Sequence, residues 1–353
     1  MPYSACLRAP CQSLRIAVVQ FAPKIGQVQQ NIERARKYCE SLVPGTVDLL
    51  CLPEMIFTGY AFESASAILP FLEHPHSGVT SQFCASIAQR LGCHVAAGYP
   101  ERLEPHEVGK RMLEEGDGGG GGGGVRVVDV VGANSAVLYG PDGMRVGHYR
   151  KSHLFHMDKV WAKPGPGFAT FHLPPPLNTI TLGICMDLNP QSPSWTIDGG
   201  PYELAEHCLK TGSGLLILLN AWLDSEKEQD VQVDISTLNC WATLLRPLWC
   251  RMGNDDSNER EGTAESLKNV SEDTETVVVV CNRSGDENGA TFAGSSALFH
   301  LRQSAGKPSL LEYMGRRQEG VMCVDNLRLS SPVECTLRYR TCRAQKWLGK
   351  RPV

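Results

Sequence analysis

Short apolar runs alternate with amphipathic segments along most of this chain. Each apolar run is bounded by polar or turn-forming residues, which predicts a buried β-strand, and apolar residues at helical spacing predict a helix. The predicted strands are residues 15–20, 49–52, 94–98, 134–139, 179–184, 215–220 and 276–282, and the predicted helices are residues 31–42, 80–91, 202–211 and 231–245. Because strands and helices alternate, the pattern predicts an α/β fold with buried strands.

Two stretches interrupt this alternation. Residues 104–125 include seven consecutive glycines, which would lose too much conformational freedom on ordering, and they lack the Gly-Lys-Ser/Thr ending of a phosphate-binding loop. Residues 254–275 are rich in acidic side chains and have no large apolar stripe. We therefore predict two disordered inserts within one domain at residues 14–353, preceded by a flexible leader at residues 1–13.

The overall composition is that of a globular protein with a substantial core. The 353 residues are 42% hydrophobic, and the formal net charge of −4 provides no basic surface for nucleic acid. No apolar stretch approaches the length of about 20 residues that spans a bilayer. Neither a nucleic-acid partner nor a membrane is therefore expected.

The 14 cysteines are spaced irregularly, and several lie inside apolar runs, among them Cys51, Cys240 and Cys281. This pattern favours reduced core thiols over a disulfide framework or a zinc site, so we expect an intracellular protein with no metal and no cofactor. A cytoplasmic location is predicted. Because residues 1–13 contain a basic residue and no acid, a mitochondrial address is the alternative.

Three chemically reactive residues each follow an apolar or strand-like segment: Glu54, Lys151 and Cys185. A thiol has an ordinary pKa of about 8.5 and becomes a good nucleophile when a base removes its proton or a cation favours the thiolate. Glu54, desolvated by neighbouring leucines, is expected to have a raised pKa and to act as that base. Lys151 and the backbone N–H of Met186 are expected to stabilise the oxyanion. The predicted reaction is acyl transfer through a thioester, with loss of ammonia.

Each of the three residues also has an ordinary structural interpretation. Cys185 could be a core residue of an apolar strand, Glu54 could begin a helix after Leu-Pro, and Lys151 could be a solvated charge beside an arginine. The combination, with each residue at the end of its segment, favours thiol catalysis.

The blocks that carry these residues resemble a known family. Leu-Pro-Glu54-Met, Tyr-Arg-Lys151-Ser-His-Leu-Phe and Gly-Ile-Cys185-Met-Asp are similar to the three catalytic blocks of the nitrilase superfamily of carbon-nitrogen hydrolases. The resemblance extends over roughly residues 14–302, interrupted by the two inserts. It implies a four-layer αββα sandwich, paired subunits in a homodimer, and a site at one end of the two sheets in which Glu54, Lys151 and Cys185 are catalytic.

One position departs from the pattern of this superfamily. Many of its amidases have a second glutamate eight residues after the lysine, and the ungapped equivalent here is Lys159. The neighbouring Asp158 is the candidate replacement, so we expect it to be an auxiliary catalytic residue.

Further segments point to a narrower group. Phe57-Thr-Gly-Tyr60, Cys185-Met-Asp-Leu-Asn-Pro190 and Asn220-Ala-Trp-Leu223 resemble the fungal protein N-terminal asparagine amidohydrolases. This resemblance implies that the substrates are protein or peptide N-termini bearing Asn or Gln, deamidated to Asp or Glu for the arginine N-degron pathway.

Such an enzyme must also bind an α-ammonium group, and a buried cation needs an anionic partner. Asp187 is the favoured carboxylate, with capping of local backbone N–H groups as its alternative role. The candidate substrate-binding residues are Tyr60, Met186, Asp187, Asn220 and Trp222.

Two other functions remain open at this point. The same chemistry could act on a free small amide, carbamoyl compound or nitrile. Alternatively, the chain could be an inactive scaffold that binds a partner through its acidic insert.

Overall fold

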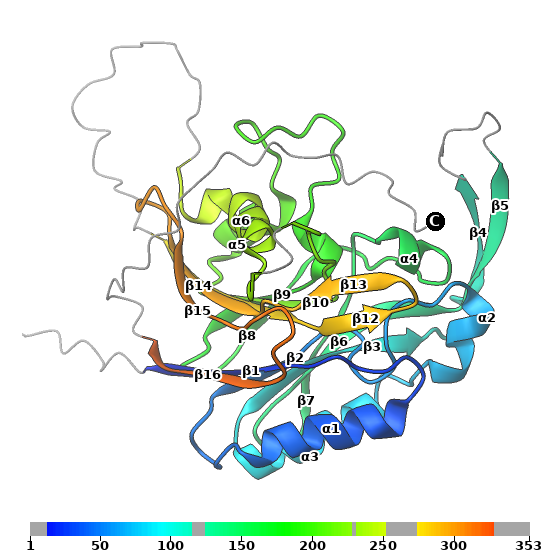
Figure 1. The fold of residues 1–353 in the computed structure, drawn as a ribbon, viewed down its shortest axis with the longest axis horizontal. Coiled ribbons are helices and arrows are strands. Elements are labelled where there is room, and N and C mark those ends of the chain that lie inside the picture. Colours follow the sequence, from blue (N-terminus) through cyan, green and yellow to red (C-terminus); the bar gives the residue numbers. More distant parts are fainter. Residues whose placement is uncertain (1–12, 115–123, 228–230, 252–273, 328–353) are drawn as a thin grey trace, which may run out of the picture.

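The computed structural model describes residues 13–114, 124–227, 231–251 and 274–327 (Figure 1). Two six-stranded sheets make up its centre. The first has the order β16 (Gly320–Leu327), β1 (Leu14–Gln20), β2 (Leu49–Leu52), β3 (His94–Arg102), β6 (Gly132–Tyr139) and β7 (Arg145–Arg150). The second has the order β15 (Ser309–Tyr313), β14 (Ala297–Arg302), β11 (Glu275–Asn282), β10 (Leu215–Asn220), β9 (Thr179–Ile184) and β8 (Ala169–His172).

The central strands are buried on both faces, as their unbroken apolar sequences require. In β2, Leu49 and Cys51 pack into the core between the two sheets, whereas Leu50 and Leu52 pack toward the helices. This alternation follows from the two-residue period of a strand. Parallel pairing of β1, β2 and β3, and of β9, β10 and β11, aligns the carboxyl ends of these strands within each sheet.

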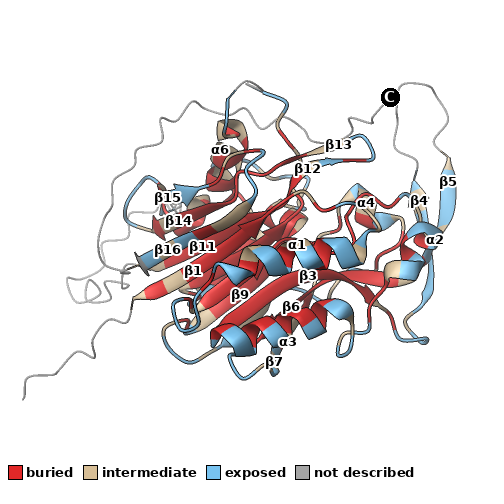
Figure 2. Ribbon diagram, turned by 60° about the horizontal axis from the view of Figure 1, so that its bottom comes forward, coloured by how far each residue is buried: buried red, intermediate tan, exposed pale blue. Residues whose placement is uncertain are grey.

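Helices cover the outer face of each sheet. The first sheet is covered by α1 (Val28–Glu40) and α3 (Val79–Leu91), and the second by α5 (Glu203–Thr211) and α6 (Ile235–Leu244). Figure 2 shows that α1 and α3 bury the side that faces the strands, and the buried residues of α5 and α6 pack against the second sheet. The predicted four-layer αββα sandwich is therefore confirmed.

The prediction of a disordered insert at residues 104–125 is wrong for its described part. Residues Gly109–Glu114 form β4, which pairs with β5 (Val125–Val130) in a two-stranded antiparallel sheet at the edge of the molecule (Figure 1). Arg111 anchors this hairpin through bonds to the carbonyls of Lys159 and Ala162, at 3.1 and 2.7 Å. These anchors are remote in sequence, so local composition did not reveal them.

The other predicted irregular segments lie mostly or wholly outside the described residues. They are the leader at residues 1–13, the glycine run of the first insert, and the second insert at residues 254–275; the structure does not describe residues 1–12, 115–123 and 252–273. The second insert was predicted to end at Glu275, which instead begins β11.

Several further elements complete the described chain. They are the short helices α2 (Ala65–Ile68) and α4 (His156–Lys159), and a hairpin of β12 (Ser284–Glu287) and β13 (Ala290–Ala293). β16 pairs antiparallel with β1 at the edge of the first sheet. Among the described residues, no helix is both long enough and apolar enough to cross a membrane.

Candidate active site

The structure brings Glu54, Lys151 and Asp158 together. Glu54 follows β2, and Lys151 follows β7, although the two residues are far apart in sequence. The ammonium of Lys151 donates to Glu54 Oε1 at 2.7 Å and to Asp158 Oδ2 at 2.6 Å. All three side chains are buried, with no exposed surface on Glu54, Lys151 or Asp158. The solvated-surface interpretation of Lys151 is therefore wrong.

Asn134, the third residue of β6, is a member of this cluster that the sequence did not predict. Its amide nitrogen donates to Glu54 Oε1 at 2.6 Å and to Asp158 Oδ1 at 2.9 Å. Asp158 also accepts the backbone N–H of Phe155 at 2.9 Å at the start of α4. A polar residue that opens an apolar strand was the available signal for Asn134.

Cys185 lies at the end of β9, next to this cluster. Glu54 Oε2 accepts the backbone N–H of Ala221 at 2.6 Å, and Ala221 and Cys185 line one pocket. The charges of Glu54, Lys151 and Asp158 all act on the pKa of the Cys185 thiol. The three residues predicted to converge therefore lie in one electrostatic environment.

The backbone at Cys185 adopts a left-handed conformation, with φ of +42°. Such a conformation is unfavourable for a residue with a side chain and costs about 1–3 kcal/mol. The N–H of Cys185 donates to Asn220 Oδ1 at 3.0 Å, which holds the turn against the end of β10. Met55, directly after Glu54, has φ of +44°, so left-handed backbone occurs beside both reactive residues.

Burial and charge together set the proton affinities in the cluster. Burial raises the pKa of Glu54, and the charge of Lys151 partly offsets this effect. Burial by itself would lower the pKa of Lys151, but the charges of Asp158 and Glu54 raise it above its usual range. Burial raises the pKa of Cys185 well above its usual range, against the lowering effect of Lys151 and of the Ala221 N–H. The resting thiol is therefore protonated at neutral pH and needs a base to become a nucleophile.

Asp187 does not have the free carboxylate that an α-ammonium would need. Its Oδ1 accepts the N–H groups of Ser152 and His153 at 2.9 and 2.8 Å. Its Oδ2 accepts the N–H of Ile184 and the hydroxyl of Tyr149, both at 2.8 Å. The prediction that Asp187 binds substrate is therefore corrected to its alternative role, the capping of local backbone N–H groups. These bonds join the turn at Cys185 to the segment around Lys151.

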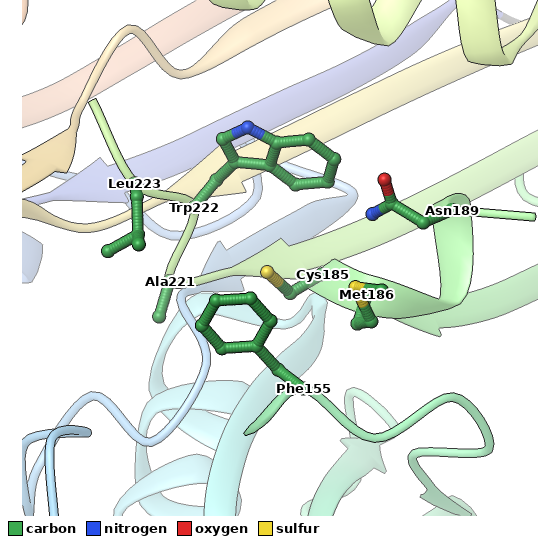
Figure 3. A pocket seen from close by; sticks show the side chains of 7 residues that line it. All are labelled: Phe155, Cys185, Met186, Asn189, Ala221, Trp222 and Leu223. Carbon is green, nitrogen blue, oxygen red and sulfur yellow. The ribbon is translucent and has the colours of Figure 1, made fainter. Parts of the chain in front are cut away.

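An apolar pocket adjoins the sulfur of Cys185 (Figure 3). Two predicted substrate-binding residues, Met186 and Trp222, line it. The indole of Trp222 packs edge-on against Trp241, with ring centroids 6.0 Å apart. The pocket residues that the sequence did not assign are Phe155, Asn189, Ala221 and Leu223, all of which belong to the motif segments around Lys151, Cys185 and Asn220.

Tyr60 and Asn220 do not belong to this lining. Both are buried; the Tyr60 ring lies over the Lys151 ammonium, 5.5 Å from its centroid, and Asn220 supports the Cys185 backbone. Both therefore contact the reactive residues, and their predicted contact with substrate stays a prediction. Within the described ranges, no three His, Cys, Asp or Glu side chains are grouped as metal ligands.

Comparisons with known proteins agree with this architecture. The model of the carbon-nitrogen hydrolase family matches residues 15–257. A protein N-terminal amidase of Schizosaccharomyces pombe is 30% identical over 305 residues, which cover 82% of this chain and 92% of that protein. A protein N-terminal amidase of Saccharomyces cerevisiae is 26% identical over 245 residues, which cover 62% of this chain and 47% of that protein.

A solved structure shares the fold. The crystal structure of N-terminal amidase with an Asn-Glu-Ala peptide has a TM-score of 0.67 and 20% identity, and the match covers 89% of this chain and 97% of that chain. The family model matches well over half of the chain, and the similarity extends over both sheets. This chain belongs to the carbon-nitrogen hydrolase family and is an amidohydrolase that acts on carbon–nitrogen bonds.

Proposed function

We propose that the protein is an N-terminal amidase, which converts the side-chain amide of an N-terminal Asn or Gln to a carboxylate and releases ammonia. The observation that carries the proposal is the buried Glu54–Lys151–Asp158 cluster beside the Cys185 thiol and an apolar pocket. The similarity to protein N-terminal amidases supports the choice of substrate, since the matched region spans 92% of the S. pombe relative.

The proposed reaction begins at the thiol. Glu54 takes the proton of Cys185, and the sulfur attacks the carbon of the substrate carboxamide, forming a tetrahedral intermediate. The backbone N–H of Met186 and the positive charge of Lys151 stabilise the oxyanion. Glu54 then protonates the nitrogen, the C–N bond breaks, and ammonia leaves a thioester on Cys185.

The second half of the reaction restores the thiol. Glu54 removes a proton from a water molecule, which attacks the thioester carbonyl, and the C–S bond breaks with return of the proton to sulfur. Asp158 keeps Lys151 charged throughout, since its carboxylate contacts the ammonium at 2.6 Å. Asn134, which donates to both carboxylates, keeps them at a constant separation.

The pocket suits a side chain that enters while its main chain remains outside. Met186, Asn189, Trp222 and Leu223 line it and are only partly buried, so the pocket is open on one side. When the carboxamide of the substrate lies at Cys185, the rest of the peptide can extend out of the pocket through that opening. This feature supports peptide substrates over amides that must be fully enclosed.

Ammonia release from a panel of short peptides tests the proposal. We expect turnover of peptides that begin with Asn or Gln and have a free amine, little turnover of the same peptides after N-acetylation, and none with Cys185→Ala. Equal rates for free and acetylated peptides would rule out selection for an α-ammonium. Turnover of small amides or nitriles without peptide turnover would favour the alternative substrate class, and a Cys185 thiol that reacts no faster than an ordinary buried cysteine would favour an inactive scaffold.

A further inference from the structure

The pocket beside Cys185 offers few groups that can accept a hydrogen bond. Among its seven lining residues, Phe155, Met186, Ala221 and Leu223 have apolar side chains, and the nucleophile itself is a thiol. The indole of Trp222 can only donate. Asn189 is therefore the lining residue whose side chain provides a strong acceptor. An α-ammonium has three N–H donors and needs such an acceptor when it leaves water.

Asn189 has a well-held backbone and an available side chain. It directly follows the 3₁₀ turn Cys185–Leu188, and its N–H donates to the carbonyl of Met186 at 2.9 Å. Its own carbonyl oxygen accepts from the side chain of Gln191 at 3.1 Å and lies 3.1 Å from Nδ1 of His153. In the part of the chain that the structure describes, no residue hydrogen-bonds the side-chain amide of Asn189.

We propose that Asn189 is a specificity-determining residue that binds the amino-terminal backbone of the substrate; this inference rests on the proposed N-terminal amidase function. The side-chain oxygen of Asn189 accepts a hydrogen bond from the α-ammonium, and its NH₂ group donates to the first peptide carbonyl. A carboxamide offers this pairing of one acceptor and two donors in one planar group.

The connectivity of the substrate makes this contact feasible. In an N-terminal Asn, one methylene separates the reacting carboxamide carbon from the α-carbon, so the ammonium stays within a few ångströms of the sulfur. Figure 3 shows Asn189 on one side of the pocket and Ala221 and Leu223 on the other, with Cys185 between them. A substrate attacked by Cys185 therefore has its α-carbon between these two walls of the pocket, one of which includes Asn189.

The electrostatic surroundings favour a cation beside Asn189, although none of the residues that line the pocket has a charged side chain. Two carboxylates, Glu54 and Asp158, share the single positive charge of Lys151, which leaves a surplus of negative charge behind the pocket wall. The aromatic faces of Trp222 and Phe155 also attract cations. Asn189 thus supplies the directed hydrogen bonds, and the surrounding charge offsets that of the ammonium.

Peptide binding to the inactive Cys185→Ala protein tests the inference. Titration calorimetry with an Asn-Glu-Ala peptide should show affinity at least about tenfold weaker when Asn189→Leu is added, because a hydrogen bond to a charged group is lost. Asn189→Asp keeps an acceptor and should lose less than Asn189→Leu. Gln30→Leu makes a similar polar-to-apolar change on the exposed side of α1, outside the pocket lining, and should bind as the parent does.

Kinetics in the Cys185 protein separate this role from a structural one. Asn189→Leu should raise KM for Asn peptides, reduce the preference for free over acetylated amines, and leave the rate of Cys185 alkylation by iodoacetamide unchanged. Unchanged peptide affinity would overturn the inference, as would a fall in alkylation rate equal to the fall in peptide turnover. If the parent enzyme released no ammonia from any Asn or Gln peptide, the proposed function itself would fail, which is a different outcome.

Discussion

Three buried charges, those of Glu54, Asp158 and Lys151, determine how protons are held at the active site. Removing one member would leave the others without a partner in a site that excludes water, which is costlier than losing the pair as a whole. Because two carboxylates contact one ammonium, the effect of a substitution depends on which charge is removed.

Asp158→Asn should move the acidic limb of the pH profile of kcat/KM to lower pH. The charge of Asp158 raises the pKa of Glu54, so its removal lets Glu54 ionise, and act as a base, at a lower pH. The rate at the plateau should fall about ten- to a hundredfold, because a charge-assisted bond to Lys151 is weakened. The exposed substitution Asp129→Asn is the control, and its pH profile should match that of the wild type. A shift of the acidic limb to higher pH in Asp158→Asn would contradict this account of Glu54.

Asp187→Ala should destabilise the protein rather than selectively weaken peptide binding. Three backbone N–H groups and one hydroxyl lose their acceptor, so urea denaturation should give a free energy of unfolding lower by about 2–4 kcal/mol. Asp129→Ala, on the exposed hairpin β4–β5, should leave the free energy of unfolding nearly unchanged. If Asp187→Ala kept its stability but lost affinity for free-amine peptides, the carboxylate would be a substrate ligand after all.

At the scale of elements, the active site depends on how closely β3 approaches the end of β2. Gly98 of β3 lies against the backbone of Glu54: a Cβ there would be 2.6 Å from Glu54 Cα and 2.8 Å from the nitrogen of Met55. Real Cβ atoms do not come this close, and neither contact atom is a flexible side-chain end. Any side chain at position 98 must therefore displace the backbone of Glu54.

Gly98→Ala is accordingly expected to lower kcat/KM about a hundredfold, since a misplacement of about 1 Å can cost that much. Alkylation of Cys185 at neutral pH should slow in parallel, because Glu54 would no longer be placed to take the thiol proton. Gly214→Ala is the matched control, as a Cβ there meets no atom within 4 Å. Wild-type rates in Gly98→Ala would mean that the strand end can relax without moving Glu54.

At the scale of the whole molecule, the two sheets use chain segments from both ends of the described sequence. β16 pairs with β1 along its length, with partners that include Val18 and Met322, and β15 forms the edge of the second sheet. Removing β16 would expose the hydrogen-bonding edge of β1. β1 lies next to β2, the strand that leads to Glu54.

A chain that ends at Tyr313 should therefore have a Tm lower by at least about 10 °C than a chain that ends at Leu327, or should fail to fold. The second truncation keeps every described strand and serves as the control for loss of the remaining residues. Thermal unfolding followed by circular dichroism would measure the difference; equal Tm values would show that β16 is dispensable. The predicted homodimer and cytoplasmic location stay predictions.

Long apolar strands were predictable because their pattern is local. The strands 49–52, 179–184 and 215–220 agree with the structure at both ends, and the four long helices were predicted with ends shifted by a few residues. The hairpin β4–β5 and the edge strand β16 were missed, since they depend on contacts with distant segments. Propensity in a short window carries no information about such partners. The hairpin β12–β13 was missed although its Asn288-Gly289 turn is a local signal.

The sequence by itself determined an α/β fold and the order Glu54, Lys151, Cys185, because strand and helix periodicity and motif residues are properties of neighbouring positions. The αββα class was implied by the resemblance of the motif blocks to the nitrilase superfamily. Only the tertiary structure decided what each polar side chain faces. Asn134 joins the two carboxylates, Asp187 caps backbone groups, and Asn189 lines the pocket. The physical reason is that a hydrogen bond forms only when donor and acceptor atoms approach to about 3 Å. For these side chains, that approach depends on how strands distant in sequence pack together.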